Sequence, residues 1–159
     1  MLQGRKTMSQ QDTIEALGKH PFLRGLAKHH LEALAECSQQ ITMTADQFLG
    51  REREAATTWY LIQSGRVGIE VRKGGREMVR VLVLGPGDIV GWSWIVPPHR
   101  WQFDARVLDA VRALALDAEG LRQRCEADHE LGYQLLKRLI VVVSSRLAAT
   151  QKQVLAQQV

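Results

Sequence analysis

The chain has 159 residues, a formal net charge of +4 and 45% hydrophobic residues, which is typical of one globular domain and not of a disordered or fibrous chain. Its two cysteines, Cys37 and Cys125, are far apart in sequence, which excludes a disulfide framework, a four-cysteine iron–sulfur cluster and a zinc site built from thiolates. The small basic excess indicates a nucleic-acid surface only if the bases cluster on one face.

The first residues, from Met1 to Thr7, contain no apolar stretch that would form a signal peptide. The longest uncharged apolar run, Leu139 to Val143, is far too short to cross a membrane. We therefore expect a cytoplasmic protein that starts at Met1 or Met8, with a disordered tail over residues 1–11.

Residues 12–40 are predicted to form helices. Apolar residues such as Ile14 and Leu17 recur at helical spacing, and Leu31 and Leu34 do so again after a break. The break falls at His20-Pro21, because proline disfavours helix in the residue before it.

Residues 41–117 are predicted to form strands. Val67, Ile69 and Val71 alternate with charged residues, and Val79, Val81 and Val83 alternate after a Lys73-Gly74-Gly75 turn, so both segments look like strands with one buried face. A further turn is predicted at 85–87, and a last strand at 105–116, kinked or interrupted near Asp109. Short strands separated by glycine turns favour a barrel or jelly roll.

Residues 118–159 are predicted to be helical, with two apolar stripes in the last helix. One stripe contains Leu135, Leu139 and Val142, and the other is a heptad seam. The seam consists of Tyr133, Leu136, Ile140, Val143, Leu147 and Val154, with Thr150 in the remaining position. Either both stripes lie in one wide core face, or the seam pairs two subunits in a homodimer, which is the interpretation we favour.

The predicted fold class is therefore α+β, mainly β: an antiparallel β-roll or jelly-roll barrel flanked by N-terminal helices and a long C-terminal dimerisation helix. A single domain is expected over residues 12–159.

Three segments carry a resemblance to a known family. Residues 48–67 read F-L-G-R-E-R-E-A-A-T-T-W-Y-L-I-Q-S-G-R-V, residues 82–91 read L-V-L-G-P-G-D-I-V-G, and residues 135–155 contain an apolar helix with an Arg146-Leu147 pair. In this order they resemble cyclic-nucleotide-binding domains of the catabolite-activator/FNR (Crp/Fnr) superfamily. The resemblance covers about residues 22–155 and implies the same β-roll, a phosphate-binding cassette at 87–107 and a dimer helix.

The cassette departs from the family pattern. The resemblance implies a glutamate after Gly91 for the ribose hydroxyl, and about nine residues later an arginine for the cyclic phosphate. Here Trp92 and Trp101 stand at those positions, with Gln102 after the latter. Tryptophan offers a single N–H donor and no charge, so neither replacement supplies the missing chemistry. A slip of one residue would place Arg100 at the phosphate position.

The candidate ligand-binding residues are Gly91, Trp92, Ser93, Arg100, Trp101 and Gln102. Three interpretations of the tryptophan-rich segment 91–106 remain open. The aromatics fill the space of a nucleotide, or they wall a site in which Arg100 or Arg106 holds an anion, or they form an exposed surface for a partner protein. The ligand would be cyclic AMP, cyclic GMP or another small anion, if one binds at all.

Other function classes receive little support. Family members that bind DNA carry a helix-turn-helix after the dimer helix, and this sequence ends at Val159, so DNA binding is not expected. The basic residues of the last two helices (Arg122, Arg124, Lys137, Arg138 and Arg146) are expected to form a solvated face. The side chains of adjacent His29 and His30 should diverge by about 100° on a helix and therefore share no metal. His99 is a weak candidate for a haem ligand. Asp104 and Arg106 would form a polar pair.

The sequence therefore predicts a non-catalytic sensory or regulatory module, with no metal and no membrane segment, that signals through its C-terminal helix to a protein partner. The alternatives are a ligand-free dimeric scaffold and a conventional cyclic-AMP receptor that uses Arg100.

Overall fold

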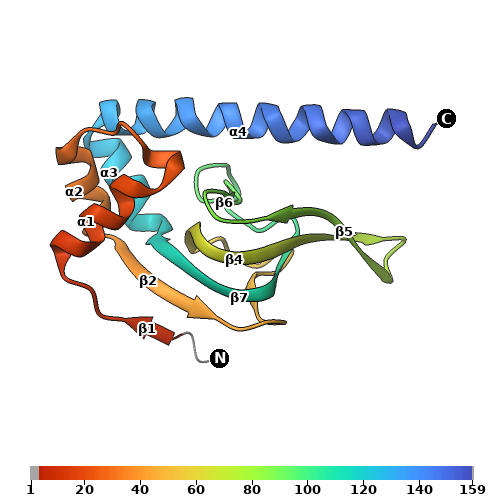
Figure 1. The fold of residues 1–159 in the computed structure, drawn as a ribbon. Coiled ribbons are helices and arrows are strands. Elements are labelled where there is room, and N and C mark those ends of the chain that lie inside the picture. Colours follow the sequence, from red (N-terminus) through yellow and green to blue (C-terminus); the bar gives the residue numbers. More distant parts are fainter. Residues whose placement is uncertain (1–3, 159) are drawn as a thin grey trace.

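The computed structural model describes residues 4–158 and consists of one antiparallel β-roll with helices at one end and a long helix along one side (Figure 1). The helical elements are α1 (Gln10–Lys19), the 3-10 turn η1 (Pro21–Leu23), α2 (Lys28–Ala35), α3 (Ala118–Ala127) and α4 (His129–Ala156). The strands are β1 (Gly4–Lys6), β2 (Ser38–Met43), β3 (Phe48–Gly50), β4 (Thr58–Lys73), β5 (Glu77–Leu84), β6 (Ile89–Val90) and β7 (Asp104–Asp117).

All strand pairs are antiparallel, in the order β1-β2-β7-β4-β5, with β3 also paired to β7 and β6 to β4. The predicted α+β fold class, with a β-roll and a long C-terminal helix, is confirmed. The turn at Gly74 and Gly75, where φ is 58° and 77°, joins β4 to β5 as expected. α1 also ends where His20-Pro21 predicted, because the His20 backbone leaves the helix in an extended conformation.

The prediction for the N-terminal residues is wrong. Residues 1–11 were expected to be a disordered tail, yet Gly4–Lys6 form β1 on the edge of β2, and α1 already begins at Gln10, capped by Ser9. The prediction for residues 1–3 lies outside the described residues. β7 runs unbroken from Asp104 to Asp117, but its pairing with β4 is irregular near Asp109, as the sequence predicted. Between the Ser64–Arg112 pair and the Val67–Val107 pair, β7 contains more residues than β4.

The core has two parts. One lies between the helices and the roll and includes Leu17, Leu34, Trp59, Leu116 and Leu135. The other fills the roll itself, and its members include Ile41, Tyr60, Val67, Trp101 and Val107. The cassette lies between these two clusters, because its tryptophans belong to both.

The two apolar stripes of α4 have different environments. Leu135 and Leu139 are buried against the helices and the roll, so the helix packs onto its own domain through this stripe. The seam residues Tyr133, Ile140 and Leu147 are 56–62% exposed. The idea that both stripes share one core face is therefore wrong for the single chain, and the seam is left uncovered.

Of the basic side chains that the sequence predicted on a solvated face of the last two helices, Lys137 is exposed, whereas the arginines are half-buried and hydrogen-bonded to other parts of the domain. Arg122 donates to the Trp94 carbonyl at 2.8 Å, Arg124 to the Ala33 carbonyl at 2.7 Å, and Arg138 to the Arg24 carbonyl at 3.1 Å. These guanidinium groups fasten α3 and α4 to the rest of the domain, because a charged donor on a backbone carbonyl makes a strong hydrogen bond. Among the described helices, none is both long enough and apolar enough to span a bilayer.

Candidate functional site

The tryptophan-rich part of the cassette begins where β6 ends. Gly91 has φ 77°, a conformation that favours glycine, and its carbonyl accepts a hydrogen bond from the Trp59 indole N–H at 3.0 Å. A compact turn follows, in which the Ile95 N–H donates to the Trp92 carbonyl and the His99 N–H donates to the Val96 carbonyl. The chain then rejoins the roll at β7. This path places the tryptophan-rich segment against the mouth of the roll.

Trp101 lies inside the roll. Its side chain is 6% exposed, and its backbone N–H donates to the Glu54 carbonyl while its own carbonyl accepts from the Arg53 N–H, at 2.9 and 2.7 Å. The indole packs edge-on against Phe103 at a centroid distance of 5.8 Å and lies 6.5 Å from the Tyr60 ring. Trp101, which the sequence resemblance predicts at the phosphate-binding position, is therefore a core residue.

The space around Trp101 is nearly closed. The cavity between the β6 end and the cassette has a volume of about 10 Å³, which is about the room of one water molecule. Its walls are Ala56, Thr58, Trp59, Val90, Gly91, Trp92, Ser93, Trp94 and Trp101. A nucleotide does not fit in this cavity, because small-molecule sites enclose about 300–1,000 Å³.

Arg100, the alternative phosphate ligand, lies on the other side of the same segment. Its side chain is exposed, and its guanidinium donates to the Arg53 carbonyl at 2.9 Å. The backbone of Arg100 forms an isolated bridge with Ala55, which fixes the register of the loop. Because successive residues of an extended segment alternate in direction, burying Trp101 leaves Arg100 outside the cavity.

The other candidate residues lie at different depths. Ser93 is buried, and so is Trp94, which packs against Trp59 at 5.2 Å in the helix-side core. Trp92 is half-buried, and Gln102 is exposed. The six predicted site residues therefore do not converge on one open pocket.

The predicted Asp104–Arg106 pair does not form. The Asp104 carboxylate accepts from the Glu52 N–H at 2.8 Å, whereas Arg106 pairs with Glu70 at 2.9 Å. Glu70 is 5% exposed and is held from its other oxygen by Arg80 at 3.3 Å. Arg106 is thus neutralised by a buried carboxylate and is not available as a free anion anchor.

A groove that the sequence did not predict runs between α4 and the β5 edge, with a volume of about 860 Å³. Val81 and Val83 were expected to lie on a buried strand face, yet they are 41% and 46% exposed and line this groove. Phe103 and Trp92 of the cassette line it as well. The groove therefore connects the cassette to the C-terminal half of α4, which extends away from the helical end of the domain (Figure 1).

Arg146 joins α4 to the cassette. Its guanidinium donates to the Ile89 carbonyl at 2.6 Å and lies 5.6 Å from the centre of the Trp92 ring. Burial lowers the pKa of Arg146, partly opposed by the nearby Asp88 carboxylate. The contact is a charge-assisted hydrogen bond in a partly dry setting, which is among the stronger polar interactions in proteins.

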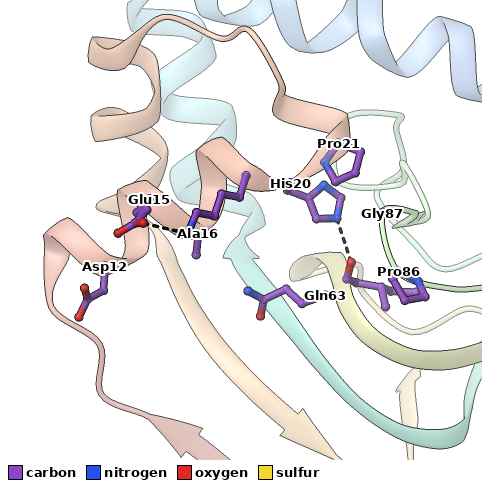
Figure 2. A pocket seen from close by; sticks show the side chains of 10 residues that line it. Asp12, Glu15, Ala16, His20, Pro21, Gln63, Pro86 and Gly87 are labelled. Atoms are coloured by element: carbon purple, nitrogen blue, oxygen red, sulfur yellow. Dashed lines mark hydrogen bonds and ion pairs between the residues drawn. The ribbon is translucent and has the colours of Figure 1, made fainter.

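A second cavity, of about 470 Å³, lies between α1, β4 and the 85–87 turn (Figure 2). His20 forms part of its wall. The His20 side chain is 4% exposed, its Nε2 lies 3.0 Å from the Ile62 carbonyl, and its Nδ1 accepts from the Phe22 N–H. The N–H on Nε2 and the acceptor on Nδ1 define a neutral imidazole, and burial lowers the pKa of His20 accordingly.

Comparison with known proteins gives one family. The model of the family described as "Cyclic nucleotide-binding domain" matches residues 40–128, more than half of the chain. A curated relative, the CRP-like cAMP-activated global transcriptional regulator of Mycobacterium tuberculosis (strain CDC 1551 / Oshkosh), is 28% identical over 137 residues. The match covers 86% of this chain and 59% of the relative, so the chain spans about three fifths of that protein's length.

Solved structures share the fold. A cyclic nucleotide-binding domain from Methylobacillus flagellatus KT has a TM-score of 0.77 at 17% identity, covering 93% of this chain and 83% of that chain. The regulatory subunit of a cAMP-independent protein kinase A from Trypanosoma brucei has a TM-score of 0.69 at 22% identity, covering 87% and 51%. At these identities the likeness concerns the fold.

Proposed function

The chain belongs to the cyclic nucleotide-binding domain family, and on that premise we propose that residues 12–159 act as a non-catalytic regulatory module with a remodelled, closed cassette. The module signals through α4, where it forms a homodimer and is read by a protein partner.

The observation that carries this proposal is the position of Trp101. A tryptophan replaces the arginine that the resemblance implies for the cyclic phosphate, its ring is buried in the roll, and the cavity beside it holds only about 10 Å³. Trp92 stands in place of the glutamate for the ribose hydroxyl. The packing that a ligand would provide is supplied by the protein itself.

The proposed signal from the cassette to α4 depends on the contacts of Arg146. Because Arg146 is bonded to the Ile89 carbonyl, a movement of β6 would shift α4 or break this bond, and a movement of Trp92 would change its ring contact with the Arg146 guanidinium. Rigid elements with two packing arrangements are the usual means by which such shifts spread.

The dimer rests on the uncovered seam. Tyr133, Leu136, Ile140, Leu147 and Val154 are each about half exposed or more, at heptad spacing along one face of α4. Exposed apolar residues in a continuous row are typical of an interface, and a seam of this kind favours a two-fold pair of helices.

A second candidate function, a conventional cyclic-AMP receptor, is favoured by one observation. The curated Mycobacterium tuberculosis relative is a cAMP-activated regulator. For this chain to bind a cyclic nucleotide in the same manner, Trp101 must leave the roll and Arg100 must give up the Arg53 carbonyl. Both changes cost free energy that the ligand would have to offset.

Isothermal titration with cyclic AMP and then cyclic GMP tests the proposal. We expect no saturable heat at ligand concentrations of about 1 mM, a level far above ordinary cofactor affinities. Saturable micromolar binding that Arg100→Glu abolishes would contradict the closed cassette and establish the receptor. Arg72→Glu, which reverses an exposed charge on β4, is the matched control.

A further inference from the structure

Two histidines of α2 and the aspartate before α4 converge at the helical end of the domain, away from the cassette. His29 and His30 lie in the first turn of α2, and Asp128 is the N-cap residue of α4. One ring nitrogen of each histidine and one oxygen of Asp128 all lie within 4.8 Å of one another. The expected divergence of the two histidines is wrong, since their ring centroids are 4.1 Å apart.

His30 is the unusual member of this group. Its side chain is 3% exposed, and within residues 4–158 neither of its ring nitrogens has a hydrogen-bond partner of good geometry. Its Nε2 lies 3.2 Å from Asp128 Oδ2. Buried polar atoms are nearly always satisfied, so an imidazole in this state requires a physical reason, and a bound cation provides one.

The Asp128 carboxylate is held in a fixed orientation that leaves one oxygen available as a ligand. Its Oδ1 accepts from the backbone N–H groups of Glu130 and Leu131, at 3.1 and 3.3 Å, and this leaves Oδ2 for His30. The exposed side chain of His29 opens the group to solvent.

We propose that His29, His30 and Asp128 bind a divalent transition-metal ion, for which Zn²⁺ is the best match. Two imidazole nitrogens and one carboxylate oxygen suit zinc, and three protein ligands leave a fourth position for water. The ligand atoms must close to about 3.3 Å around a tetrahedral ion, because Zn–N bonds are about 2.0–2.1 Å long. His29 can make that adjustment because it is exposed and free to change rotamer.

The ion would tie the first turn of α2 to the first turn of α4. It would thereby hold the base of the helix that carries the seam, without touching the cassette or the α4–β5 groove. The site is independent of the proposed closed cassette, because none of its residues lines either feature.

The test uses the full chain, stripped with EDTA and titrated with ZnCl₂ alone. We expect one equivalent of Zn²⁺ to bind and the melting temperature to rise by about 5–10 °C at about 100 times the Kd. His29→Ala and Asp128→Asn should each weaken binding by about tenfold or more. Neither should unfold the protein, because His29 is exposed and the asparagine retains the oxygen that caps α4. His129→Ala, an exposed neighbour outside the group, is the matched control and should bind as the unmodified chain does.

Absence of saturable binding at one equivalent would overturn the proposal. Unchanged Zn²⁺ affinity in both His29→Ala and Asp128→Asn would also overturn it. In that case, loss of Zn²⁺ binding in Cys125→Ser alone would assign the ion to a thiol. A tetrahedral absorption band with Co²⁺ that is lost in His29→Ala would support the site independently of stability.

Discussion

The packing of Trp101 against Gly50 gives the sharpest test of a closed cassette. A Cβ placed on Gly50 would lie 2.0 Å from Cε2 of the Trp101 ring, so Gly50→Ala cannot be accommodated while the indole is inside the roll. Overpacking of this kind costs about 1–3 kcal/mol of unfolding free energy. Trp101→Ala removes a ring that is 6% exposed and should cost about 3–5 kcal/mol.

The two changes should not be additive. Once the indole is gone, the methyl group introduced by Gly50→Ala enters the vacated space, and the cost of that substitution should fall to about zero. The expected coupling energy is therefore about 1–3 kcal/mol. Urea unfolding followed by circular dichroism on the four proteins of the cycle measures it, and Trp101→Ala alone should lower the melting temperature by about 10 °C.

Gly85→Ala is the matched control, because a Cβ at Gly85 meets nothing within 4 Å. It should change stability by less than about 0.5 kcal/mol. Additive costs for Gly50→Ala and Trp101→Ala, or a cost below about 1 kcal/mol for the latter, would refute the reasoning. Trp101 would then spend its time outside the roll, and the cassette would be open.

Three further predictions concern α4 and the helical end. Ile140→Glu places a charge in the seam and should convert a dimer to a monomer, as measured by light scattering. Ala148→Glu, at an exposed position outside the seam, should leave the dimer intact. A monomeric parent chain would exclude the seam as an interface. Arg146→Leu removes the hydrogen bond to the Ile89 carbonyl and should cost about 1.5–3 kcal/mol in urea unfolding; a neutral result would mean that α4 is not fastened there. Because burial lowers the pKa of His20, the unfolded chain takes up the proton more readily. The contribution of His20 is therefore complete above about pH 6.5 and is lost as the pH falls through the lowered value. Unfolding free energies measured from about pH 7.5 to about pH 5 should decline more in the parent chain than in His20→Gln, and equal slopes would refute this assignment.

Local patterns predicted most of the fold because they reflect local physics. His20-Pro21 ends α1, and Gly74 and Gly75 turn the β4–β5 hairpin. The strand predicted from the alternation after Val67 forms, but its burial does not alternate, because Glu70 is buried and Val71 is exposed. The β1 strand escaped prediction because a three-residue edge strand is held by backbone pairing with β2, which side-chain periodicity does not report.

The cassette was less predictable because its geometry depends on distant partners. Whether Trp101 or Arg100 faces inward is set by the bridge from Arg100 to Ala55 and by the hydrogen bond from Trp101 to the Glu54 carbonyl. Those pairings join segments far apart in the chain, and no local spacing specifies them. The sequence therefore left a filled pocket, an aromatic-walled site and an exposed partner surface as alternatives, and the proposed function takes the first because the Trp101 indole is buried.

Val81 and Val83 show that local patterns also fail to predict which apolar side chains are covered at the surface. Their alternation is that of a buried strand face, and the groove with α4 leaves them about half exposed instead. A strand pattern reports that a face is apolar and says nothing of what covers it. The same holds for the α4 seam, where the heptad pattern indicates a helical partner that only a second chain can supply.

Under the proposed function, a closed cassette changes what controls α4. A ligand-gated module needs two positions of the helix that bind the ligand with different affinity. Here Trp101 fills the roll, and Arg146 fastens α4 to the cassette through the Ile89 carbonyl, so one position is favoured without a ligand. The remaining influences on α4 then act from outside the roll, at the seam and at the Asp128 end of the helix. Control of such a module passes from a small molecule in the cassette to whatever binds its helix.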